Sequence, residues 1–172
     1  FEIKTFKGMD LMQLCGAVKN LYDNATTMHQ PSEILVDVIG LGAGVVDRLS
    51  EQGLPVRGIN VAESPSSRKN YLNLRAELWW SMRDWLTARD CRLPEDDELI
   101  AELSTPQYTY TSTGKIKIEA KEMMRKRGIK SPDKADALAL TMASSAASFG
   151  GKFSAMGYNF KQPLKSKIIR VG

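Results

Sequence analysis

An aspartate interrupts an otherwise apolar run in the first quarter of the chain. Residues 34–39 read Ile-Leu-Val-Asp-Val-Ile, and Gly40 follows at once. Such a run predicts a central strand covered on both faces, where an unpaired carboxylate is costly to bury. Asp37 is therefore expected to be neutral, paired with an arginine or bound to a metal ion. Its place at the carboxyl end of a strand, where α/β proteins collect ligands, favours a functional role.

Two further aspartates stand at the predicted start of a helix. Ser131 suits the N-cap and Pro132 the first turn, and the helix is predicted to run to about residue 147. The i, i+3 spacing of Asp133 and Asp136 puts both carboxylates on one face. The helix dipole alone accounts for Asp133. Small and apolar residues follow Asp136, so an acid on this packing face is better explained by a bound cation.

These aspartates together predict a carboxylate metal site. Hard cations such as Mg²⁺ or Mn²⁺ take oxygen ligands, whereas the single His29 and the two separated cysteines, Cys15 and Cys91, cannot make a zinc site. Two such ions about 3.5–4 Å apart clamp the attacking and leaving oxygens in phosphodiester hydrolysis. The chemistry predicted from these residues is thus two-metal hydrolysis.

The glycines after Asp37 allow a second interpretation, a dinucleotide site. Gly40, Gly42 and Gly44 follow a predicted strand, and Glu63 lies about 20 residues on, where an acid could bind a ribose. The full pattern would need glycine at the position of Val45, however, and Asp37 is awkward in such a strand. The glycines are better explained as a tight turn that keeps side chains away from Asp37.

The elements that must position these residues alternate between strand and helix, which predicts an α/β fold. In chain order they are a strand over 1–7, a helix capped by Asp10 and ending near residue 23, the strand at 34–39, a helix over 45–51, a strand over 56–61, a helix over 71–88, a helix beginning at the acids of 95–98, a hairpin of 108–111 and 115–118, a short basic helix over 121–127 and the helix at Ser131. Trp79, Trp80 and Trp85 are predicted to pack in or beside the core rather than to stack on bases.

Charge is unevenly distributed along the 172 residues, although the net charge is only +4. Residues 1–114 hold 11 Lys and Arg against 16 Asp and Glu, and residues 115–172 hold 13 against 4. This split suggests a polyanionic partner on one side of the molecule. A basic run crosses the hairpin and the following helix, and it suits either a solvated face or contact with DNA phosphates. Its members are Lys115, Lys117, Lys121, Arg125, Lys126, Arg127 and Lys130.

No apolar stretch of the sequence is long enough for a membrane span, and the presence of two cysteines predicts a reducing compartment.

Three segments resemble the nuclease domain of the large terminase subunit of tailed, headful-packaging bacteriophages. They are residues 36–49 (VDVIGLGAGVVDRL), 71–80 (YLNLRAELWW) and 126–138 (KRGIKSPDKADAL), and the resemblance covers about residues 1–148. It implies a ribonuclease H-like fold, a mixed central sheet flanked by helices with a β-hairpin insertion. It also implies an endonuclease that cuts concatemeric viral DNA with two Mg²⁺ or Mn²⁺ ions.

The resemblance assigns roles residue by residue. Asp37 matches the metal ligand on the second catalytic strand, Asp136 the metal ligand on the late helix, and Asp133 an acid that assists it. The implied partners are double-stranded DNA, the portal protein, the small terminase subunit and a covalently preceding ATPase motor, in the cytoplasm of the host cell. Residues 149–172 match a flexible basic tail that engages the portal.

Two departures from the family pattern are expected to matter. The family's first catalytic aspartate, on a strand before Phe1, is absent from this chain, and so is the P-loop of the motor. The chain is therefore expected to lack the first strand of its sheet, which puts its activity in isolation in question. A ribonuclease H-like resolvase or recombinase, and a non-catalytic module that docks on portal or DNA, are the alternative functions.

Overall fold

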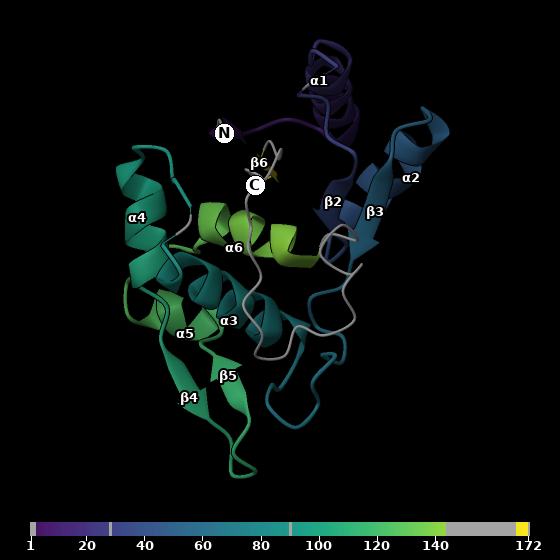
Figure 1. The fold of residues 1–172 in the computed structure, drawn as a ribbon. Helices are drawn as coiled ribbons and strands as arrows, with labels where there is room; N and C mark the ends of the chain where they lie inside the picture. Colours follow the sequence, from purple (N-terminus) through teal and green to yellow (C-terminus); the bar gives the residue numbers. More distant parts are fainter. Residues whose placement is uncertain (1–2, 28, 90, 144–167, 172) are drawn as a thin grey trace.

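The computed structural model describes residues 3–27, 29–89, 91–143 and 168–171 (Figure 1). The elements in chain order are β1 (Ile3–Phe6), α1 (Leu11–Asp23), β2 (Ile34–Asp37), α2 (Gly42–Glu51), β3 (Val56–Ile59), α3 (Leu74–Thr87), α4 (Asp97–Ser104), β4 (Tyr108–Tyr110), β5 (Ile116–Ile118), α5 (Lys121–Lys126), α6 (Asp133–Leu140), the 3₁₀ helix η1 (Thr141–Ala143) and β6 (Ile168–Val171). The predicted mixture of strands and helices is confirmed.

The strands of the described residues form three pairs. β2 and β3 are parallel, with Asp37 opposite Ile59, and β4 and β5 form the predicted antiparallel hairpin, with Tyr108 opposite Ile118. β1 pairs in parallel with β6, which lies in the segment assigned to the tail and was not predicted from the sequence. Of residues 149–172, the structure describes 168–171, which form β6, and the others lie outside the described ranges.

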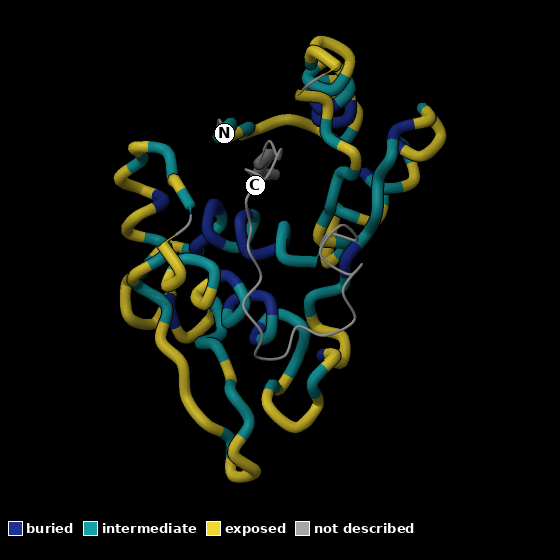
Figure 2. Tube along the Cα trace, viewed as in Figure 1, coloured by how far each residue is buried: buried dark blue, intermediate teal, exposed yellow. Residues whose placement is uncertain are grey.

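Two apolar clusters make up the core of the part of the chain that the structure describes. One joins α1 and α2 to β2 and β3; its buried members are Leu14, Cys15, Val18, Val45, Leu49 and Leu54. The other lies where α3, α4 and α6 meet and includes Trp79, Met82, Leu99 and Leu138, with Trp85 packed against it. Buried residues run along α3 and α6 in the centre of the molecule (Figure 2). The prediction that Trp79 and Trp85 serve packing is therefore confirmed.

Helix starts follow their capping residues closely. Asp10 caps α1 in a reciprocal capping box with Gln13, as predicted, and Asp96 caps α4 by accepting from the Leu99 N–H. The prediction that the third long helix begins at residue 71 is wrong. Asn73 accepts from the Ala76 N–H and starts α3 at Leu74, while Tyr71 forms a bridge with Ile116 beside the hairpin.

Helix α6 also differs from its prediction. Pro132, not Ser131, occupies the N-cap position, and no side chain of the described ranges caps the helix there. The Ser131 hydroxyl donates instead to Oδ1 of Asp133, at 2.6 Å. The α-helix ends at Leu140 and continues as the 3₁₀ helix η1 to Ala143, while residues 144–147 lie outside the described ranges. Among the described residues, no helix is both long enough and apolar enough to cross a membrane.

Candidate active site

The three predicted aspartates line one cavity of about 670 Å³. It lies beside the carboxyl end of β2, and its walls come from α1, β2, α2, α3, α5, α6 and the residues around β5. Asp37 enters from β2, and Asp133 and Asp136 enter from the first turn of α6. No three His, Cys, Asp or Glu side chains of the described ranges lie close enough to enclose a metal ion by themselves. The cavity therefore offers separate carboxylates rather than a closed cage.

Asp37 is exposed, which corrects the prediction of a buried strand aspartate. The strand ends at Asp37 rather than at Ile39, and the Ile39 N–H donates to Oδ1 of Asp37 at 3.1 Å. The chain then turns sharply through Gly40, whose φ is +79°. Desolvation therefore does not explain Asp37, and its carboxylate is open to a cation or to solvent.

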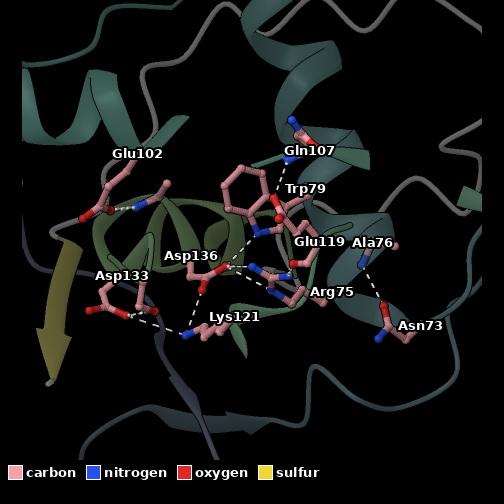
Figure 3. A network of polar contacts seen from close by, with 12 residues as sticks. Asn73, Arg75, Ala76, Trp79, Glu102, Gln107, Glu119, Lys121, Asp133 and Asp136 are labelled. Carbon is pink, nitrogen blue, oxygen red and sulfur yellow. Dashed lines mark hydrogen bonds and ion pairs between the residues drawn. The ribbon is translucent and has the colours of Figure 1, made fainter. Parts of the chain in front are cut away.

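Asp136 is held by donors from another helix (Figure 3). Oδ1 accepts from Arg75 Nε at 3.2 Å, from Arg75 Nη2 at 3.1 Å and from Trp79 Nε1 at 2.7 Å. Oδ2 is buried and accepts no hydrogen bond among the described residues, although Lys121 Nζ forms an ion pair with it at 2.9 Å. The two oxygens of this carboxylate thus have different environments.

Asp133 shares a cation with Asp136. Lys121 Nζ lies 3.6 Å from Oδ1 of Asp133 as well as 2.9 Å from Asp136 (Figure 3). This confirms that the i, i+3 spacing places both carboxylates on one face of α6. In the structure an ammonium group occupies the space between them.

The basic run is divided by the structure. Lys121 pairs with the two acids of α6, and Arg127 pairs with Glu119 through contacts of 2.8 Å (Nε to Oε1) and 2.6 Å (Nη2 to Oε2). The hydrogen bonds from Arg127 hold the pKa of Glu119 below its usual value. The other members keep exposed positions, except the half-buried Lys115; they are Lys117, Arg125, Lys126 and Lys130.

The start of α6 is fixed by acids of α4, which sequence reasoning did not connect with the site. Glu102 Oε2 accepts from the Ala135 N–H at 2.9 Å (Figure 3), and burial raises the pKa of Glu102. Lys134, 8% exposed, donates to both oxygens of Asp96 at 2.9 and 2.7 Å and pairs with Glu98 at 2.8 Å. These hydrogen bonds raise the pKa of Lys134, with Asp96 the main cause. α4 thereby anchors the turn that presents Asp133 and Asp136.

Arg75 and Trp79 are the other site residues to which sequence reasoning gave no role. The i, i+4 spacing was a usable signal that they share one face of α3. Nothing local indicated that this face would meet Asp136, which is 61 residues from Arg75 and 57 from Trp79.

Comparison with known proteins gives structural neighbours. No family model matches the chain, and neither does any curated protein. Three similar solved structures are point-mutant nuclease domains of the large terminase subunit gp2 of bacterial virus Sf6. The one with manganese and β-thujaplicinol is 25% identical, covers 79% of this chain and 74% of its own, and has a TM-score of 0.62.

The other two give similar values. The domain with manganese alone is 25% identical over 80% of this chain and 75% of its own, with a TM-score of 0.62. The domain with calcium is 26% identical over 80% and 74%, with a TM-score of 0.60. The resemblance predicted from the motifs is therefore confirmed, and the chain has the ribonuclease H-like fold of the nuclease domain of a phage terminase large subunit.

Proposed function

We propose that this chain is a metal-dependent DNA endonuclease domain of a viral genome-packaging terminase, which cleaves concatemeric DNA. The observation that carries the proposal is the convergence of Asp37, Asp133 and Asp136 on one cavity. It is supported by the likeness to terminase nuclease domains that were solved with manganese and with calcium.

The donor set fits a hard divalent cation. All three side chains offer carboxylate oxygens. Oδ2 of Asp136 is buried and accepts no hydrogen bond from the described residues, although it pairs with the Lys121 ammonium. Mg²⁺ keeps several waters and takes only one or two carboxylates plus phosphate oxygens, so a closed protein cage is not required. When bound, two Mg²⁺ or Mn²⁺ ions would activate the attacking water and stabilise the leaving oxygen.

Each aspartate has a distinct task in this proposal. Asp37, exposed at the end of β2, and Asp136, fixed at the start of α6, would hold the metal ions. Asp133 assists from the same face of α6, and its carboxylate is oriented by the Ser131 hydroxyl. The phosphate of the substrate would supply further oxygen ligands.

Duplex DNA is the proposed substrate, and the exposed basic residues of the hairpin and α5 are its proposed contacts. Lys117 lines the cavity, and Arg125, Lys126 and Lys130 are exposed nearby in sequence. Lysine and arginine side chains bind the phosphates of DNA without regard to base sequence, so these residues suit contact along the DNA backbone. Lys121 and Arg127 contribute less in this proposal, because acids already pair with them.

The larger assembly is also a proposal. On the motif resemblance to terminase large subunits, an ATPase motor precedes residues 1–148 in the full-length protein, a small terminase subunit and a portal protein are partners, and residues 149–172 contact the portal. The proposed setting is the host cytoplasm.

The test measures Mn²⁺ uptake by calorimetry and Mn²⁺-dependent nicking of plasmid DNA, in the full-length protein. Asp37→Asn and Asp136→Asn should each abolish cleavage and weaken Mn²⁺ uptake while leaving the circular dichroism spectrum unchanged. Asp47→Asn, an exposed acid of α2, is the matched control and should behave as wild type.

Undiminished cleavage by either site variant would overturn the assignment. Carboxylate-independent Mn²⁺ uptake together with absent cleavage would favour the docking-module alternative. Faster cutting of a four-way junction than of linear duplex would favour a resolvase.

A further inference from the structure

The two oxygens of Asp136 have different partners: Arg75 and Trp79 donate to Oδ1, and the Lys121 ammonium pairs with Oδ2. Resting on the proposed function, we propose that Arg75 and Trp79 are positioning residues that occupy Oδ1 and leave Oδ2 as the single atom through which Asp136 binds a divalent ion. Neither residue would touch the metal ion or the substrate. Their task would be to set the direction and the coordination mode of the ligand.

Three N–H groups converge on Oδ1. They are Arg75 Nε and Nη2, at 3.2 and 3.1 Å, and Trp79 Nε1, at 2.7 Å. A carboxylate oxygen has two lone pairs, so three donors leave it no capacity for a metal bond. A planar guanidinium and a rigid indole also restrict where the oxygen can lie.

The donors are themselves immobilised. Arg75 Nη1 donates to the main-chain carbonyl of Glu119 at 2.9 Å, and the Arg75 guanidinium carbon lies 5.6 Å from the centre of the Trp79 ring. Trp79 is 7% exposed within the core cluster of α3, α4 and α6. Arg75 thereby connects α3, the residue that follows the hairpin, and α6 at one point (Figure 3).

Oδ2 has the opposite environment. It accepts no hydrogen bond in the described part of the chain, and it faces the Lys121 ammonium, which also lies near Asp133. A cation therefore already occupies the side of the carboxylate that the proposal gives to a metal ion. Side chains that orient a metal ligand in this way typically raise the affinity for the metal ion about 10- to 100-fold.

The first experiment measures Mn²⁺ affinity by electron paramagnetic resonance, in the full-length protein. Trp79→Phe removes one donor and keeps an aromatic ring. Arg75→Lys keeps the positive charge and removes the planar guanidinium, two nitrogens of which donate to Asp136. Each should weaken Mn²⁺ binding about 10- to 100-fold. Trp85→Phe, in the same cluster, is the matched control and should bind as wild type.

The outcomes separate this inference from the function on which it rests. If Asp136→Asn binds Mn²⁺ as wild type, the proposed role of Asp136 fails and the inference fails with it. If Asp136→Asn loses affinity while Trp79→Phe and Arg75→Lys keep it, only the inference is overturned.

The second experiment uses the wild-type chain and needs no substitution in the site. The three tryptophans give three indole N–H signals by nuclear magnetic resonance, and Trp80→Phe and Trp85→Phe assign two of them, so that the third belongs to Trp79. The Trp79 indole proton should stay protected from hydrogen exchange when Mg²⁺ saturates the protein, because Oδ1 keeps its donors. Loss of that protection would show that Oδ1 becomes a metal ligand and would contradict the proposal.

Discussion

Gly42 lies directly against the main-chain carbonyl of Asp37. A Cβ atom at position 42 would stand 1.7 Å from that oxygen and 2.7 Å from the carbonyl carbon. The glycine is therefore required because the first residue of α2 closes over the end of β2. This contact supports the expectation that the glycine turn keeps side chains away from Asp37.

Gly42→Ala should accordingly displace Asp37. The clash is with main chain, which cannot rotate away, so we expect a loss of about 1–3 kcal/mol or more in the free energy of unfolding. Urea denaturation measures this loss, and Mn²⁺ uptake should fall as well. Gly16→Ala in α1 is the control. No atom of the described residues would lie within 4 Å of its Cβ, and the variant should gain about 0.5–1 kcal/mol in the free energy of unfolding. Equal stability of the two variants would contradict the tight turn.

Lys121→Met should bind Mn²⁺ more tightly than wild type. The Lys121 ammonium lies 2.9 Å from Asp136 and 3.6 Å from Asp133, so a metal ion must compete with its charge. We expect about a tenfold gain in affinity, equivalent to about 1.4 kcal/mol. The gain is read as a larger rise in melting temperature on adding Mn²⁺. Lys130→Met, an exposed residue before α6, should show no gain. A weaker response in Lys121→Met would mean that the ammonium helps to build the metal site.

Asp96→Asn should lower stability in a pH-dependent way. Hydrogen bonds from Lys134, and then from the Leu99 N–H, hold the pKa of Asp96 below its usual value. The contribution of its charge is therefore complete above the ordinary pKa of an unfolded aspartate, and it is lost as the pH falls through the lowered pKa. Asparagine keeps an acceptor for the helix cap and loses the charge.

Urea denaturation at several pH values measures the effect. Asp96→Asn should be less stable than wild type by about 1 kcal/mol near pH 7, and the difference should vanish in strong acid. Asp97→Asn, an exposed acid in the same first turn, should show little change. A difference that stays constant from neutral to acidic pH would rule out a charge effect at Asp96.

Removing two exposed charges from α5 should weaken duplex binding mainly at low salt. The variant combines Arg125→Ala with Lys126→Ala, and fluorescence anisotropy of a labelled duplex measures its affinity. If both contact phosphates, the slope of log K against log salt should fall by about 2, which is about 0.9 for each contact. A control with Lys19→Ala and Arg48→Ala removes two charges that pair with acids on α1 and α2, and its slope should match wild type. An unchanged slope in the α5 variant would show that this face is merely solvated.

Local features of this chain were predictable because each is encoded within a few residues. The capping box at Asp10, the hairpin around Gly114 and the shared face of Asp133 and Asp136 all depend on contacts within one or two turns. The three short motifs that resemble terminase nucleases could also be recognised from the sequence, because each is contiguous. The structural neighbours confirmed that resemblance. The start of α3 was misplaced because Asn73 competes locally with a helical pattern that extends further back.

The tertiary structure alone decided how the site is assembled. The sequence by itself identified Asp37, Asp133 and Asp136 as a set, but it could not show that Asp37 is exposed or that Lys121 lies between the acids of α6. It also gave no sign of the pairs Arg75–Asp136 and Lys134–Asp96, whose members are 61 and 38 residues apart. The physical reason is that hydrophobic periodicity determines which face of a helix is buried but not which side chain it meets. The packing of α3 and α4 against α6 makes that choice, and it determines which oxygen of Asp136 accepts from Arg75 and Trp79.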